Sequence, residues 1–217
     1  TKLLVDCGLF QGFKNLRLKN WDSFPVDPSE ISAVLLTHAP HAHSGYIPLR
    51  VKNGFSGPIY CTSATRDLCS LLLPDSGFLQ EEEAQYATRK GFSKHKPALP
   101  LYTEKDAQFC LQFFKTVKWG EKNPIPGNSS EAISFEFHPA GHLFGAASIL
   151  VRHGKKSLAF SGDVGRKSDP VTRDPNFRIK ADTLIMESTY GNKTHSSKSP
   201  KDELGAIIRK TYERGGT

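Results

Sequence analysis

Short apolar runs, most of them followed by a polar turn, recur along the chain and predict a protein rich in β-strands. Runs such as 33–36 are continuously apolar and indicate strands buried on both faces, whereas 133–138 alternates apolar and polar residues, as a strand with one buried face does. An apolar run, a turn at 153–156 and a second apolar run predict a hairpin. We expect strands at 2–6, 33–36, 58–61, 117–119, 133–138, 148–151, 157–160 and 182–187.

Helical patterns separate several of these strands. We expect a short helix over 46–51, and a second one that starts at Thr62 and that Pro74 ends or kinks near residue 73. A third pattern covers 78–88 with three glutamates early, which suits the helix dipole. Thr103 is the expected N-cap of a helix through 113–114, and a last helix covers 200–213. Strands and helices in alternation predict an α/β fold.

The length of the chain favours one substantial core, although it leaves room for an inserted subdomain. No run of 18 apolar residues is present, and no secretory leader is visible. The first residue is Thr1 and a strand follows at once, while the sequence stops just after Gly216, so both ends are expected to be cut. Four cysteines without paired spacing are expected to be buried thiols of a cytoplasmic protein.

The net charge of +7 and a pI near 9.2 agree with a polyanionic partner, although they also fit a merely basic protein. Basic residues are denser at 89–96 and at 115–122. Because a nucleic-acid footprint requires such residues on one face, the charge alone leaves both readings open.

The polar feature that stands out is a loop with three histidines in six residues. His38, His41 and His43 directly follow the buried strand at 33–36. Neutral imidazole is the commonest metal ligand in proteins, and ligands on one tight loop converge at a small entropic cost. A single histidine here would be a packed side chain. Three of them predict a metal site at the end of this strand.

Four further strand ends carry a carboxylate or a histidine. Asp6 ends the first strand, His142 follows the strand at 133–138, and Asp163 and Glu187 follow two later ones. Each has an ordinary alternative role, such as a turn former, a packed histidine or a carboxylate at a helix start. We expect them to share one rim of the fold, because ligands of α/β proteins gather at strand ends.

These residues lie in short sequence motifs that resemble the motifs of a known family. Thr37 to Gly45 is similar to the signature loop His-x-His-x-Asp-His of the metallo-β-lactamase fold, with His38 and His43 at its first and last positions. Pro40 occupies the position of the motif's second histidine, and Ala42 occupies the position of its aspartate. His41 is one residue out of register with the motif. The words Asp-Cys-Gly, Ala-Gly-His-Leu-Phe-Gly, Ser-Gly-Asp-Val-Gly-Arg and Glu-Ser-Thr-Tyr-Gly resemble the β-CASP RNA-processing nucleases, which include ribonuclease J and the cleavage and polyadenylation endonuclease.

The resemblance implies an αββα sandwich, here incomplete at both ends, with a metallo-β-lactamase-like domain at 1–191. Residues 192–217 are then a linker and a helix that lead toward an absent β-CASP cap. It also implies one zinc held by His38, His142 and Asp163, and a second zinc that Asp163 bridges and His43 helps to hold. Asp6 and Glu187 are implied as catalytic carboxylates that orient the imidazoles. Ser188 and Thr189 are implied in substrate binding.

Three functions follow as hypotheses. The first is zinc-dependent phosphodiester hydrolysis of RNA, impaired because Pro40 and Ala42 lack metal-binding atoms. In that case the second zinc is weakly bound or lost. The first zinc site is kept only if His41 replaces its missing histidine ligand. The second hypothesis is an inactive relative that keeps the fold and RNA binding. The third is hydrolysis of a small ester or a β-lactam, since the fold alone does not choose among substrates.

Overall fold

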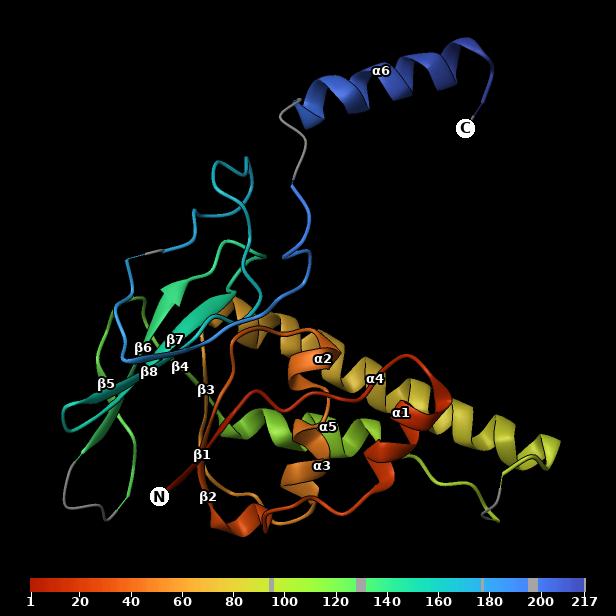
Figure 1. The fold of residues 1–217 in the computed structure, drawn as a ribbon. Coiled ribbons are helices and arrows are strands. Elements are labelled where there is room, and N and C mark those ends of the chain that lie inside the picture. Colours follow the sequence, from red (N-terminus) through yellow and green to blue (C-terminus); the bar gives the residue numbers. More distant parts are fainter. Residues whose placement is uncertain (94–95, 128–131, 177, 195–198, 217) are drawn as a thin grey trace. The chain divides into compact units, whose positions relative to one another are not determined.

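The computed structural model describes residues 1–93, 96–127, 132–176, 178–194 and 199–216 (Figure 1). Parts of two segments singled out in the sequence, the basic group at 89–96 and the linker after 192, lie outside these residues. Two compact units make up the chain, Thr1–Glu187 and Ser188–Thr217. The second unit contains the helix α6 (Pro200–Glu213), where the sequence predicts a helix, with Ser199 as its N-cap.

The first unit contains two β-sheets. The first sheet is parallel, in the order β1-β2-β3-β4, and consists of β1 (Lys2–Val5), β2 (Ile31–Leu35), β3 (Ile59–Cys61) and β4 (Phe114–Thr116). The second is antiparallel except for its last pair, in the order β5-β6-β7-β8-β9, and consists of β5 (Asn123–Pro124), β6 (Ile133–Pro139), β7 (Ala147–His153), β8 (Lys156–Phe160) and β9 (Thr183–Ile185).

The helices of the first unit follow the predicted alternation with strands. Their α-helical elements are α1 (Lys14–Leu18), α2 (His41–Ser44), α3 (Ile47–Lys52), α4 (Ser63–Lys90) and α5 (Glu104–Cys110). Short 3₁₀ turns are η1 (Lys19–Trp21), η2 (Pro28–Glu30) and η3 (Leu111–Phe113). No helix of the described part of the chain is both long and apolar enough to cross a membrane.

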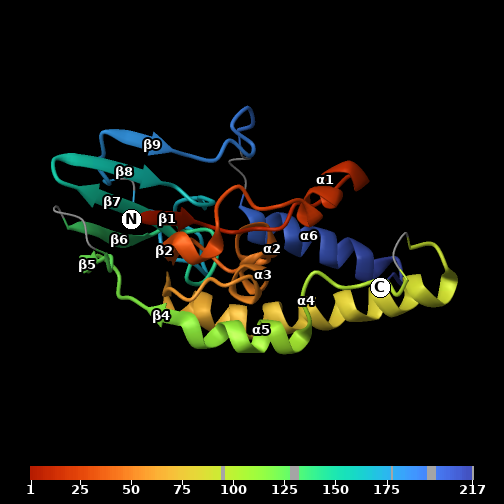
Figure 2. The same ribbon diagram turned by 90° about the horizontal axis from the view of Figure 1, so that it is seen from below.

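The apolar core lies on both faces of the parallel sheet. Strand β2 sends Leu35 toward the second sheet, where Phe135 and Phe137 of β6 are also fully buried. Its other face contributes Val34 to a cluster with side chains of α3 and α4, and Figures 1 and 2 show these helices and α5 beside this sheet. The continuous apolar run of β2 is therefore buried on both sides, as a parallel strand requires. The predicted α/β class is confirmed.

Helix α4 does not end at Pro74, which was one of the two predicted alternatives, and it joins the patterns predicted at 62–73 and 78–88 into one helix. A proline inside a helix costs about 3 kcal/mol, so the next turn needs tertiary support. The Oγ of Ser76 lies 2.9 Å from the hydroxyl of Tyr102, and both side chains are buried. At Gly77 the helix approaches α5 so closely that a Cβ would lie 2.6 Å from the amide nitrogen of Glu104. These contacts, which are remote in sequence, hold the helix together.

Helix α5 starts at the predicted cap, but it ends at Cys110, and the 3₁₀ turn η3 covers the rest of the predicted helix. Thr103 is the N-cap of α5, and the Thr103 hydroxyl accepts a hydrogen bond from the amide of Asp106, while the Asp106 carboxylate accepts one from the amide of Thr103. This reciprocal pair satisfies two amides that the helix itself leaves without partners. The following strand starts at Phe114, three residues before its predicted position.

Candidate metal centre

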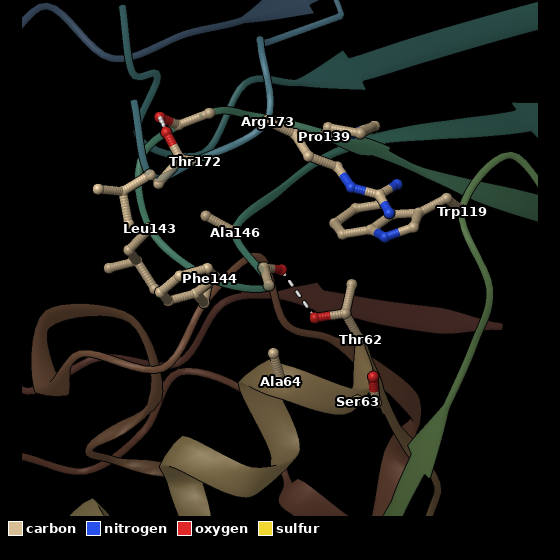
Figure 3. A pocket seen from close by; sticks show the side chains of 13 residues that line it. Thr62, Ser63, Ala64, Trp119, Pro139, Leu143, Phe144, Ala146, Thr172 and Arg173 are labelled. Carbon is tan, nitrogen blue, oxygen red and sulfur yellow. Dashed lines mark hydrogen bonds between the residues drawn. The ribbon is translucent and has the colours of Figure 1, made fainter. Parts of the chain in front are cut away.

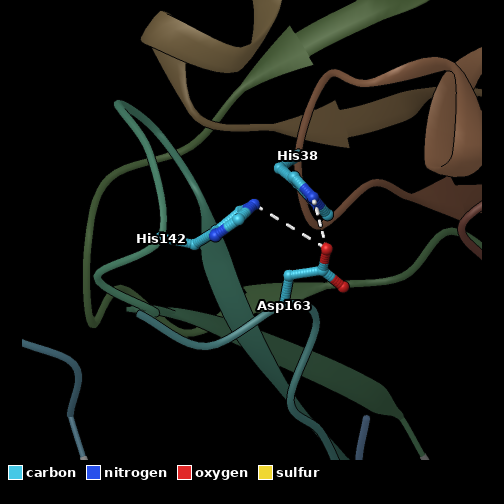
Figure 4. A group of neighbouring side chains, drawn as sticks. All are labelled: His38, His142 and Asp163. Carbon is cyan, nitrogen blue, oxygen red and sulfur yellow. Dashed lines mark ion pairs between the residues drawn. The ribbon is translucent and has the colours of Figure 1, made fainter. Parts of the chain in front are cut away.

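The strand ends of the first unit bring the predicted side chains to one place. His38 follows β2, His142 lies in the loop between β6 and β7, and Asp163 follows β8. Nε2 of His38 lies 3.5 Å from Oδ2 of Asp163, and Nε2 of His142 lies 3.7 Å from the same oxygen (Figure 4). One ligand atom from each of the three lies within 4.8 Å of the others. Three separate segments thus bring together side chains that could hold a metal ion.

His43 faces the other oxygen of the same carboxylate. Its Nε2 lies 3.4 Å from Oδ1 of Asp163, and its ring centroid is 4.0 Å from that of His38. Asp163 therefore presents one oxygen to His38 and His142 and the other to His43. A carboxylate in this position can bridge two metal ions, which is the role that the sequence resemblance implies for it.

Asp6 orients two residues of the histidine loop. Its Oδ2 accepts hydrogen bonds from Nδ1 of His43 at 2.8 Å and from the hydroxyl of Thr37 at 2.8 Å, while its Oδ1 accepts one from the Thr37 amide at 2.7 Å. The backbone of Asp6 is left-handed, with φ at 57°, which few residue types besides Gly, Asn and Asp adopt easily. By accepting this hydrogen bond, the carboxylate keeps the proton of His43 on Nδ1 and leaves Nε2 free as a ligand.

The Thr37 hydroxyl extends this network to His38. Since that hydroxyl donates its proton to Asp6, its oxygen accepts one from Nδ1 of His38, at 2.9 Å. Nε2 of His38 then carries a lone pair, and it is buried without a hydrogen-bond partner. Burial, together with the neighbouring rings of His43 and His142, lowers the pKa of His38 to about 3. A neutral, fixed imidazole with an unused nitrogen beside a carboxylate fits a bound cation.

The pKa of His43 moves in the opposite direction. Burial acts to lower it, but the hydrogen bond to Asp6 and the charges of Asp6, Asp163 and Glu187 outweigh burial and raise it. The cluster thus combines one imidazole that stays neutral with one that readily accepts a proton in the absence of a competing cation.

Glu187 supports Asp163 through the backbone. Its carboxylate accepts a hydrogen bond from the amide of Val164, the residue after Asp163, and its own amide donates to Oγ of Ser161 at 3.0 Å. This places Glu187 behind the Asp163 loop, where it holds the loop in position. The predicted grouping of Asp6 and Glu187 around the cluster agrees with these contacts.

Close backbone packing fixes the histidine loop against the segment after β1. The amide of Cys7 donates to the carbonyl of His43, and a Cβ on Gly8 would lie 1.6 Å from the carbonyl oxygen of Ala42. Only glycine fits at position 8 without moving the loop. The Asp-Cys-Gly motif is thereby explained: its aspartate binds the histidine loop, and its glycine allows the close approach of the Ala42 carbonyl.

The structure does not bring His41 to the cluster, although the sequence suggested it as a replacement ligand. Its Nε2 lies 3.1 Å from the carbonyl oxygen of Leu72 in α4, so this side chain serves the contact between α2 and α4. Ser188 and Thr189 belong to the second unit, and their role in substrate binding stays a prediction. The sequence did not point to Thr37, whose hydroxyl lies between Asp6 and His38. Its position between the end of β2 and His38 is the sequence feature that could have indicated it.

Two stacked sheets with a histidine and aspartate cluster at their strand ends define the class of protein. The chain belongs to the metallo-β-lactamase superfamily, whose domain model matches residues 1–184. This family is the one that the sequence resemblance indicated, and its fold implies that the cluster binds a divalent metal.

Curated relatives agree with this assignment. The chain is 32% identical to Ribonuclease TTHA0252 of Thermus thermophilus over 216 residues, which is 99% of this chain and 44% of the relative. It is 30% identical to Transcription termination factor FttA of Methanocaldococcus jannaschii over 222 residues, covering 100% of this chain and 32% of the relative. The predicted resemblance to RNA-processing nucleases is confirmed, and the chain spans less than half the length of these relatives.

A solved structure of a B3 metallo-β-lactamase with an active-site glutamic acid also matches. The match covers 77% of this chain and 57% of the β-lactamase chain, with 17% sequence identity and a TM-score of 0.42.

Proposed function

We propose that this chain forms the metal-binding part of an RNA phosphodiester hydrolase that uses zinc. The observation that carries the proposal is the arrangement of two imidazoles, His38 and His43, with their Nδ1 atoms engaged and their Nε2 atoms directed at Asp163. The names of the curated relatives, a ribonuclease and a termination factor, support RNA as the substrate.

The donor set fits zinc in the first position. Zinc bound at about 2.0–2.1 Å in a tetrahedron separates its ligand atoms by about 3.4 Å. The distances of His38 and His142 from Oδ2 of Asp163, 3.5 and 3.7 Å, are close to this spacing. A zinc ion held by His38, His142 and Asp163 would supply the Lewis acidity that such hydrolysis needs, by lowering the pKa of water and stabilising negative charge on phosphate.

The residues of this chain support that chemistry in distinct ways. Asp6 and Thr37 hold His38 and His43 in the tautomers that present Nε2, and Glu187 holds the loop of Asp163. Basic side chains bind the phosphate backbone with little dependence on base identity. The four cysteines are all free and buried, which supports the reducing, cytoplasmic setting expected from the sequence.

Pro40 and Ala42 weaken the metal site, because neither side chain has an atom that binds zinc. By the resemblance, Pro40 removes one of four ligands from the first position, which keeps His38, His142 and Asp163. Ala42 removes a carboxylate from the second position, which keeps His43 and Asp163. Stable zinc sites use three or four protein ligands, and His41 is engaged with Leu72 instead. We therefore expect one zinc per chain and slow hydrolysis. The same observation favours, as a second candidate function, a non-catalytic relative that binds RNA.

Zinc content and RNA cleavage, measured on the same preparations, test the proposal. We expect about one zinc in the wild-type chain, loss of zinc in His38→Ala, and a second zinc with faster cleavage in the double variant Pro40→His/Ala42→Asp. A chain that holds zinc and cleaves neither before nor after this restoration would favour the non-catalytic relative. Faster hydrolysis of a chromogenic cephalosporin than of single-stranded RNA would overturn the choice of substrate.

A further inference from the structure

A cavity of about 390 Å³ lies against the loop that carries His142. Figure 3 shows three groups of side chains around it: Trp119 and Arg173 on one side, Leu143 and Phe144 on another, and the start of α4 below. All of these residues belong to the first unit. The metal cluster uses none of them.

The cavity shares a wall with the metal centre. Gly141 and Leu143, the neighbours of His142 on both sides, line it. The loop is anchored at both ends. The hydroxyl of Thr172 donates a hydrogen bond to the carbonyl oxygen of Gly141 at 2.9 Å, and the hydroxyl of Thr62 donates one to the carbonyl oxygen of Gly145 at 2.7 Å. A group bound in this cavity therefore lies one residue away from a metal ligand, on a wall that is held in place.

The lining favours a flat, polarisable group with an anionic neighbour. Trp119 is a half-buried indole whose body packs against the core of the second sheet, and Phe144 is 61% exposed. Arg173 adds an exposed guanidinium group, which stacks on aromatic rings as well as binding phosphate. No carboxylate is present among the residues that line the cavity, so a metal ion or a basic peptide is disfavoured.

The polar groups at the base of the cavity agree with this choice. Ser63 and Ala64 are the first two residues of α4, a helix of 28 residues, so the positive end of its dipole faces the cavity. This potential attracts a negatively charged chain and repels a cation. Stacking surfaces beside positive potential are the combination with which proteins bind single-stranded nucleic acids.

We propose that this cavity binds one nucleotide of a single-stranded RNA, with its base against Trp119 and Phe144 and its phosphate near Arg173. The site rests on the proposed function for its ligand class, and it would position the nucleotide next to the phosphodiester at the metal centre. Because every base has a stacking face, binding here tolerates different sequences.

Tryptophan fluorescence offers a direct test, since the chain has two tryptophans, Trp21 and Trp119. Trp21→Phe leaves Trp119 as the single reporter, and Trp119→Phe leaves Trp21. Each protein is titrated with the hexanucleotide rA6 in EDTA, so that cleavage plays no part. We expect rA6 to quench Trp119 and to leave Trp21 unchanged.

Affinity variants separate stacking from general charge. In the Trp21→Phe background, Phe144→Ala should weaken rA6 binding by about 5- to 150-fold, the range for loss of one base–aromatic stack. Arg173→Gln should weaken it more than the matched control Arg178→Gln, which removes an exposed arginine that does not line the cavity. Circular dichroism confirms that each variant is folded.

The outcomes distinguish this site from the proposed function. Quenching of Trp119 in a chain that never cleaves RNA supports the site and counts against the hydrolase. A chain that cleaves RNA while Trp119 stays unquenched, with equal KM for wild type and Phe144→Ala, overturns the site and leaves the hydrolase in place. Equal losses in Arg173→Gln and Arg178→Gln would also overturn it, because they reduce the effect to net charge.

Discussion

The hydroxyl of Thr37 donates to the carboxylate of Asp6 at 2.8 Å, and this bond determines which nitrogen of the adjacent His38 is free. Thr37, just after β2, thus sets the tautomer of a cluster histidine although its own side chain is not part of the cluster. His38 is presented as a ligand by two residues that lie 31 positions apart in the sequence and meet because β1 and β2 are neighbours.

Replacement of Thr37 tests this relationship. In Thr37→Val the shape is kept, but Nδ1 of His38 loses its acceptor, so we expect zinc affinity to fall by about 10- to 100-fold. Competition with a chromogenic chelator measures this change. Thr37→Ser should retain most of the affinity, and Thr183→Val, at an exposed strand position, should have no effect. Equal affinities in Thr37→Val and wild type would contradict the role of the hydroxyl.

His41 provides a contrast within the same loop. Because its Nε2 contacts the carbonyl of Leu72, His41→Ala should leave zinc content unchanged and lower the free energy of unfolding by about 1 kcal/mol. Metal analysis and urea denaturation measure the two effects. His38→Ala is the matched variant, and it should lose zinc. Loss of zinc in His41→Ala would mean that this histidine reaches the metal after all.

Gly8 is predicted to be irreplaceable for packing reasons. A Cβ at this position would lie 1.6 Å from the carbonyl oxygen of Ala42, so Gly8→Ala must displace the histidine loop. We expect a destabilisation of about 3 kcal/mol or more, beyond most overpacking substitutions, together with weaker zinc binding. Gly205→Ala, in the middle of α6 with only a flexible arginine tip near its Cβ, should be neutral or slightly stabilising.

The Asp106 carboxyl predicts a dependence of stability on pH away from the metal centre. Burial acts to raise its pKa, but hydrogen bonds from Lys52 and Thr103 outweigh burial and hold the pKa below its ordinary value of 3.8. A lowered folded-state pKa contributes stability above the ordinary value, and this contribution is lost as pH falls through the folded-state pKa.

Asp106→Asn removes that contribution. The variant should be less stable than wild type at pH 6, by about 1 kcal/mol as for one side-chain hydrogen bond, and the difference should shrink as pH falls below 3.8. Urea denaturation at several pH values measures it. A difference that stays constant down to pH 3 would show that the charge of Asp106 plays no part.

Much of the site was predictable because its signals are local. Strand ends are visible as breaks in apolar runs, and this selected Asp6, His142, Asp163 and Glu187, which the structure places in and around one cluster. Their roles stay predictions. Thr103 as a helix cap depends on the residues next to it, and it was also predicted. Whether α4 ends at Pro74 was left open by the sequence, since the contacts that support its continuation come from Tyr102 and Glu104, which a local pattern does not include.

The sequence by itself therefore determined the elements, the α/β class and the segments that supply the metal ligands, because hydrophobic period and turn residues act over a few positions. Tertiary structure alone decided which histidines of the loop face the cluster. His43 is directed there by Asp6, which follows the neighbouring strand, and His38 by Thr37, whereas a carbonyl of α4 directs His41 away. Side-chain direction on a short loop depends on such partners from other segments, and spacing within the loop does not contain that information.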